Sequence, residues 1–274
     1  MKRILVPTDF SSRAENALKV AAQIAKKNNF EIHLLHMLEI PSQMNDAITG
    51  ATPIPEIMLF IQKAKETMQQ TLNKSYLKDL NIIDAIKLEK ASQGILSYSK
   101  DNAIDLIVMG SNGASGLTEF IIGSNTEKVV RLSTAPVIVI KEEINNFDPK
   151  NIVFASDFSE EIKKPFQKLL NFKQLFDANL QLVTICTPNS FKPTTLAKKI
   201  MIDFIKEFNL DNYSINIYND TNVEKGIIQF SNEINADLIS LCTHGRTGLA
   251  HFFTGSISED LANHGNKPLI IFKI

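Results

Sequence analysis

The sequence predicts an α/β protein with two tandem domains, each built on a parallel sheet. Short apolar runs of strand length alternate with helical patterns along all 274 residues, as in chains that fold into parallel sheets covered by helices. The second half also repeats the first. Asp9–Ser11 returns as Asp157–Ser159, and Asp105–Ile107 returns as Asp237–Ile239. A tandem duplication of one β-α-β-type unit explains these repeats.

The apolar patterns of the first half define its elements in order. We expect strands at residues 4–6, 31–37, 85–89, 105–109 and 136–140, and helices from about residue 12, from 56 to 77, from 94 to 100 and from 125 to 132. Ser11 or Ser12 can cap the first helix, because Glu15 follows Ser12 at the spacing of a capping box. The stretch that runs from Pro41 to Pro55 is expected to begin as a loop.

A polar and charged stretch at residues 141–150 separates the two halves. Its composition is typical of a linker, so we expect domains at residues 1–142 and 150–274. The second half then repeats the same order of elements. Pro165 lies early in its first helix, which should therefore start late or be distorted.

A glycine loop lies between the fourth strand and the last helix of the first half. Gly110 and Gly113 are followed, after nine residues, by Gly123 and Ser124. Glycines allow backbone N–H groups to approach a phosphate closely, and a helix N-terminus adds unpaired donors and a partial positive charge. The loop therefore predicts a site for an anion.

The strand-one motif Ile4–Ser11 and the spacing Gly-x2-Gly-x9-Gly-Ser together resemble the universal stress protein family, in its tandem-domain form. The resemblance implies two Rossmann-like domains of the adenine nucleotide alpha hydrolase-like kind. Each would hold a five-stranded parallel sheet of order 3-2-1-4-5. It also implies ATP, ADP or AMP at the carboxyl ends of strands one and four, with or without Mg, where doubly wound sheets usually bind ligands.

The resemblance implies a set of nucleotide contacts in the first half, which lie at strand ends and in the glycine loop. They are Pro7, Thr8, Asp9, Met37, Met109, Gly110, Gly113, Gly123, Ser124 and Asn125. Structural alternatives remain open for three of them. Ser124 could cap a helix in a box with Glu127, Asp9 could cap a helix, and Met37 could fill the core.

The second half carries a weaker version of this set. Its candidate contacts are Asp157, Gly245, Arg246, Gly255 and Ser256. Cys242 stands where the first half has Gly110, and its side chain is expected to narrow the cleft. We therefore expect nucleotide mainly in the first domain.

Composition excludes several classes of function. A net charge of −1 gives no reason to expect nucleic acid or an anionic membrane, and no apolar run reaches the ~20 residues of a membrane span. The first residues enter a strand without a signal-peptide cleavage region, so we expect a cytoplasmic protein. The five histidines lack metal-site spacing, and the two cysteines are expected to stay unbridged.

Three functions remain open on these observations. The first is a regulatory stress-response protein that binds ATP or AMP. No Walker lysine and no evident general base accompany the glycines, so it would be at most a slow ATP hydrolase. The second is an enzyme of a related nucleotide fold, whose signature motifs are absent. The third is a nucleotide-free scaffold that acts by protein–protein contacts.

The sequence also suggests how the two halves associate. The apolar strands at residues 136–140 and 268–271 need to be covered, and single-domain relatives in the resembled family pair through this strand. We expect an intramolecular pseudo-dimer with both strands near the contact face. A homodimer is left open.

Overall fold

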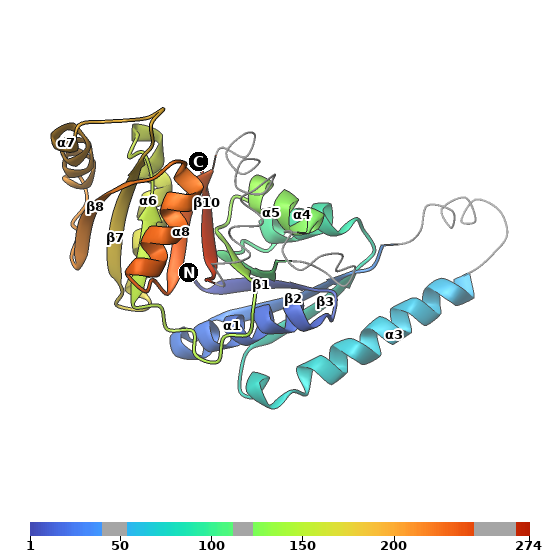
Figure 1. The fold of residues 1–274 in the computed structure, drawn as a ribbon. Helices are drawn as coiled ribbons and strands as arrows, with labels where there is room; N and C mark the ends of the chain where they lie inside the picture. Colours follow the sequence, from blue (N-terminus) through green and yellow to red (C-terminus); the bar gives the residue numbers. More distant parts are fainter. Residues whose placement is uncertain (40–53, 112–122, 244–266) are drawn as a thin grey trace.

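The computed structural model describes residues 1–39, 54–111, 123–243 and 267–274, and Figure 1 shows their arrangement. The strands of the first half are β1 (Arg3–Thr8), β2 (Glu31–Met37), β3 (Ile82–Lys87), β4 (Leu106–Gly110) and β5 (Val137–Ile140). Its helices are α1 (Ser12–Asn28), α3 (Ile54–Leu72), α4 (Ala91–Asp101) and α5 (Ser124–Leu132), with a 3₁₀ turn η1 (Ser75–Leu77).

The second half repeats these elements. Its strands are β6 (Asn151–Ala155), β7 (Asn179–Cys186), β8 (Tyr213–Asn219), β9 (Leu238–Thr243) and β10 (Leu269–Lys273). Its described helices are α6 (Lys163–Gln174), α7 (Thr194–Ile205) and α8 (Val223–Glu233), with a 3₁₀ turn η2 (Glu160–Ile162) before α6.

The ten strands of the described residues form one sheet, in the order β3-β2-β1-β4-β5-β10-β9-β6-β7-β8. Within each half the pairings are parallel and the order is 3-2-1-4-5, which confirms the predicted fold. The halves meet where β5 pairs antiparallel with β10, with Ile138 opposite Ile270. Each of these apolar strands therefore covers the edge of the other, as their composition predicted.

The sheet lies between two layers of helices (Figure 1). Successive side chains of a strand point to opposite faces, so Ile4 and Val6 enter one core and Leu5 enters the other. Residues of α1, α3, α6 and α7 pack in the first core, and residues of α4, α5 and α8 pack in the second. Each core contains residues of both halves, so the two halves share their hydrophobic interior.

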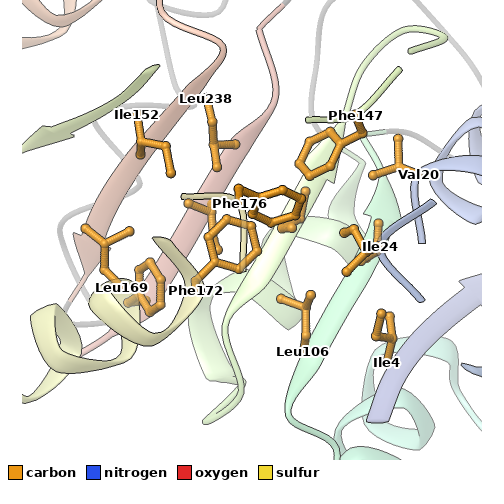
Figure 2. Packing of buried hydrophobic residues seen from close by; sticks show 14 of the residues in the cluster. Ile4, Val20, Ile24, Leu106, Phe147, Ile152, Leu169, Phe172, Phe176 and Leu238 are labelled. Carbon is orange, nitrogen blue, oxygen red and sulfur yellow. The ribbon is translucent and has the colours of Figure 1, made fainter. Parts of the chain in front are cut away.

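The stretch between the halves is more than a polar linker. Phe147 is buried and packs between α1 and the second half, as Figure 2 shows. Its backbone N–H donates to Gln23 Oε1 at 2.5 Å, and its ring meets Phe176 edge-on at a centroid distance of 5.7 Å. Lys27 of α1 pairs with Asp148 at 2.6 Å. These contacts fix the stretch against both halves.

Several boundaries differ from the predictions. β3 begins at Ile82 because its six residues pair one by one with β2 from Ile32 to Met37. α4 begins at Ala91, before the predicted start at Gly94. The helix predicted to reach residue 77 ends as α3 at residue 72, and η1 follows Lys74, whose backbone is extended.

Of the two serines that could cap α1, Ser11 does so. Ser11 is the N-cap, and its side chain accepts a hydrogen bond from the Ala14 N–H at 3.3 Å. The capping box predicted for Ser12 and Glu15 is not formed, because Ser12 already lies in the helix and the Glu15 carboxylate pairs with Lys74 at 2.6 Å.

The first helix of the second half starts late, as Pro165 predicted. α6 has 12 residues where α1 has 17, and the turn η2 occupies the missing start. Pro165 lies in the first turn of α6. A proline is tolerated there because the N–H groups of a first helical turn have no partner within the helix.

The Phe147 contact can be tested by truncation. Phe147→Ala is expected to lower the free energy of unfolding by about 3–5 kcal/mol, because the ring is 5% exposed and its removal leaves a cavity. Phe191, whose side chain is 73% exposed, is the matched control, and Phe191→Ala should change stability by about 0.5 kcal/mol or less. Urea unfolding measures both. Equal effects of the two substitutions would contradict the role of Phe147.

Candidate functional site

A pocket opens at the carboxyl ends of β1 and β4 in the first half. The strand order reverses at this position, which is where open α/β sheets usually hold ligands. The pocket contains about 710 Å³ of empty space, its open mouth included. Nine of the ten contacts predicted for this half line it: Pro7, Thr8, Asp9, Met37, Met109, Gly110, Gly123, Ser124 and Asn125. The tenth, Gly113, lies outside the described residues.

The turn after β1 places Asp9 at the mouth of the pocket. Asp9 Oδ1 accepts hydrogen bonds from the Ser11 backbone N–H at 3.1 Å and from the Ser11 hydroxyl at 2.6 Å. Thr8 Oγ1 accepts from the Phe10 N–H at 3.0 Å, and Phe10 has a φ of 63°. Asp9 is not the N-cap of α1, since Ser11 holds that position. Its carboxylate shapes the turn instead and remains exposed.

The second half builds the same turn from the same triplet. Asp157 Oδ1 accepts from the Ser159 N–H at 3.1 Å, and Ser156 Oγ accepts from the Phe158 N–H at 3.0 Å. Phe158 has a φ of 59°. Asp157 is thus placed as Asp9 is. The other four contacts predicted for this half, Gly245, Arg246, Gly255 and Ser256, lie outside the described residues.

Three hydrogen bonds fix the two ends of the glycine loop. The Gly123 N–H donates to Ser111 O at 2.7 Å, and the Ser111 N–H donates to Ile140 O of β5 at 2.9 Å. The Thr126 hydroxyl reaches back from α5 to donate to Gly110 O at 3.0 Å. The end of β4 and the start of α5 therefore lie side by side.

The N-terminus of α5 faces the pocket without a side-chain cap. Gly123 is the N-cap residue and, being a glycine, has no side chain that could make a capping hydrogen bond. The alternative in which Ser124 caps the helix in a box with Glu127 is therefore excluded, because the helix starts one residue earlier than that box requires. Ser124 and Asn125 are exposed at the pocket instead. An uncapped helix start that lines a pocket is suited to an anion.

Gly110 is required by packing on the other face of the strand. A Cβ at Gly110 would lie 3.0 Å from both the carbonyl carbon and the carbonyl oxygen of Arg13 in α1. The second half accommodates Cys242 at this position, and there the turn η2 replaces the first turn of the helix. The Cys242 side chain packs against the core shared by α1 and α6. Met109, which lines the pocket, belongs to the opposite core.

The expectation that Cys242 narrows the cleft of the second half stays a prediction, because residues 244–266 of that half lie outside the described residues. The Cys242 side chain packs on the α6 side of the sheet, and on the matching α1 side of the first half Ala14 belongs to the pocket lining. Burial raises the pKa of the Cys242 thiol to about 12, and the nearby carboxylate of Asp157 adds to the effect. Cys186 and Cys242 are both unbridged, as predicted.

Sequence reasoning missed five residues of the pocket lining: Ala14, Leu35, Ala91, Ile95 and Thr126. Leu35 could have been found, since it precedes Met37 by two residues and therefore shares its face of the strand. Ala91 and Ile95 lie one helical turn apart on α4, and only the tertiary fold brings them to the site.

The described lining of the pocket carries little charge. Asp9 is the only ionisable residue among the described residues of the lining, which include no lysine or arginine. In the described part of the chain, no three His, Cys, Asp or Glu residues gather as a metal site would require. No helix in the same part is long and apolar enough to cross a membrane.

The family profile and the individual relatives that match this chain all point to one protein family. The profile of the Universal stress protein family matches residues 1–141 and 217–273, more than half of the chain. Universal stress protein YxiE of Bacillus subtilis is 30% identical over 151 residues, which cover 51% of this chain and 98% of YxiE. Universal stress protein Slr1230 of Synechocystis sp. is 22% identical over 300 residues, and the match covers 100% of both chains.

Solved structures agree in fold along the whole chain. A universal stress protein from Archaeoglobus fulgidus superposes with a TM-score of 0.73 at 20% identity, which covers 99% of this chain and 96% of that one. A second structure, described as a putative universal stress protein from Pseudomonas aeruginosa, has a TM-score of 0.63 at 17% identity and covers 100% and 93%. At sequence identities of 20% and 17%, the structural similarity shows that the fold is shared.

The burial of Cys242 predicts slow alkylation. At about pH 9 an ordinary cysteine is largely thiolate, whereas Cys242 in the folded chain should stay protonated because its pKa is raised to about 12. With Cys186→Ser, which leaves one thiol, iodoacetamide should react at least about tenfold more slowly with folded than with urea-unfolded protein. Equal rates would contradict the burial.

The same shift has a consequence for stability. The folded chain holds the Cys242 thiol proton more tightly than the unfolded chain. The contribution of this proton to the free energy of unfolding is therefore complete below about pH 8.5 and is lost as the pH rises towards 12.

Proposed function

This chain belongs to the universal stress protein family, and from that premise we propose that it binds an adenine nucleotide in the pocket of its first half and acts as a regulatory protein of the stress response. The proposal keeps domains at residues 1–142 and 150–274, associated as an intramolecular pseudo-dimer, in a cytoplasmic protein. It assigns the nucleotide mainly to the first domain.

One observation carries the proposal. Nine residues that the family resemblance nominates as nucleotide contacts, taken from positions 7 to 125, converge on one pocket at the switch point of the sheet. Residues scattered in this way along the chain gather only through the fold. A pocket at this position of the sheet is suited to a small molecule.

The pocket has two chemically different ends. Leu35, Met37, Ile95 and Met109 form an apolar end that suits the face of a planar base. Asp9, Ser124 and Asn125 form a polar end, where a carboxylate and a hydroxyl can bond to a ribose and the uncapped start of α5 can bond to phosphates. The polarity of the pocket thus parallels that of a nucleotide.

The described lining favours binding over rapid chemistry. Asp9 is its only ionisable side chain, and one of its oxygens already accepts two hydrogen bonds from Ser11. No described lining residue is a cation that could stabilise a transferring phosphoryl group. Magnesium, when bound, would neutralise part of the phosphate charge. We therefore propose at most slow hydrolysis of ATP.

Mass spectrometry of protein denatured directly after purification tests this proposal against a nucleotide-free scaffold. Co-purified ATP, ADP or AMP is the expected result. Calorimetry with each nucleotide, with and without magnesium, then gives the affinities. Absence of binding to all three would reject the proposal and leave the scaffold.

The preference for the first half can be tested with a matched pair of glycines. Gly113→Val should lower the ATP affinity about ten- to a hundredfold, because loss of one hydrogen bond to a charged group costs about 1.5–3 kcal/mol. Gly245→Val, at the corresponding position of the second half, should change it little. Calorimetry measures both. A loss confined to Gly245→Val would reverse the assignment, and equal losses would indicate two working sites.

A further inference from the structure

Gly94 of α4 lies beside Met37, a residue of the pocket lining. A Cβ at Gly94 would lie 2.0 Å from the terminal methyl group of Met37 and 3.0 Å from its sulfur. Met37 lines the apolar end of the pocket and is half-buried there. The missing side chain of Gly94 is therefore the space in which the end of the Met37 side chain lies.

The helix that carries Gly94 is held at both ends. The Ala91 N–H at the start of α4 donates to Glu39 Oε1 at 2.7 Å. Near its other end the Tyr98 hydroxyl hydrogen-bonds with Nδ1 of the buried His33 at 3.0 Å. A methyl group added at Gly94 therefore meets a fixed helix on one side and a flexible thioether on the other. Methionine has three rotatable bonds and adapts easily, so the Met37 side chain is the part that moves.

The direction of that movement is restricted. Glu89 Oε2 lies 3.2 Å from the same Cβ position, so the space beside the start of α4 is already occupied. Among the described residues, the pocket that Met37 lines is an open space into which its side chain can move.

The second half offers a contrasting glycine. Gly226 occupies the corresponding place on α8, and a Cβ there would lie 2.6 Å from Ile185 Cγ2 and 3.1 Å from Asp220 Cβ. Isoleucine is branched at Cβ and stiff about χ1. A methyl group at Gly226 therefore strains the core, whereas a methyl group at Gly94 mainly relocates the end of one flexible side chain.

We propose that Gly94 is a positioning residue of the pocket, which acts through Met37 to set the depth of the apolar end and with it the selection of a purine base over a smaller pyrimidine. This inference rests on the proposed function for its ligand. The placement of Met37 by Gly94 can be tested separately.

Calorimetry with ATP and CTP on the full chain is the main experiment. Gly94→Ala should weaken ATP binding about tenfold, because about one methylene of misfit in an apolar pocket has an effect of this size. CTP binding should change less than about threefold, so the selectivity for ATP over CTP falls. Gly226→Ala is the matched control and should leave this selectivity unchanged. Equal losses for both nucleotides in Gly94→Ala, or unchanged ATP binding, would overturn the inference.

A double-mutant comparison separates positioning from general damage to α4. In a Met37→Ala background the side chain that moves is absent, so adding Gly94→Ala should have no further effect on ATP binding. The same tenfold loss in both backgrounds would show that Gly94 acts through the helix and would reject the role of Met37.

A ligand-free measurement keeps the test independent of the proposed function. With ¹³C-methyl methionine labelling, and the Met37 signal identified from Met37→Leu, Gly94→Ala should shift the Met37 methyl resonance. If the wild type binds neither nucleotide, the proposed function fails, and this shift still decides the placement of Met37. An unchanged resonance would overturn the inference.

Discussion

Three residue pairs join β5 to β10: Val137 with Ile271, Ile138 with Ile270, and Val139 with Leu269. Without this antiparallel contact each half would present an apolar strand edge, which is a template for association with other chains. With it, the two sheets become one and their cores merge on both faces. Phe147 adds a second connection on the α1 face. The stability of each half is therefore tied to the other.

A strained turn recurs at the start of both halves. Phe10 and Phe158 both adopt positive φ values, which cost a bulky residue on the order of 1–3 kcal/mol. In each half the hydroxyl of the residue two positions earlier, Thr8 or Ser156, accepts a hydrogen bond from the phenylalanine N–H and holds the turn. The phenylalanine ring of this turn contacts different neighbours in the two halves. Phe10 stacks on His36 at 4.4 Å, whereas Phe158 packs edge-on against Phe204 at 5.4 Å.

Much of the fold could be predicted from the sequence because the same pattern of strands and helices occurs in both halves. The offset between repeats located the strands, and Pro165 located the late start of α6. The errors fall where a non-local contact decides. Phe147 lies in a polar stretch with no periodicity, and tertiary packing against α1 and Phe176 buries it. The spacing of Ser124 and Glu127 fits a capping box, yet the extended backbone of Gly123 makes that glycine the cap.

The sequence pointed to most of the described pocket lining in the first half, but not to all of the structural reasons for it. The residues that the motif nominates do converge, because strand ends and helix starts meet at one edge of a parallel sheet. The core against which Cys242 packs was not predictable from the sequence, because helices of both halves form it. The role of Gly94 was not visible at all, since it depends on an approach to Met37 across the fold.

The antiparallel seam also reverses the chain direction halfway across the sheet. The carboxyl ends of β1 and β4 therefore lie along one rim of the sheet, and those of β6 and β9 lie along the opposite rim. The molecule is bipolar, with one strand-end surface at each pole. A small ligand bound at one pole cannot touch the other, so any communication between them must pass through the shared hydrogen bonds and packed side chains of the sheet. The two poles are also free to be recognised by different neighbours at the same time.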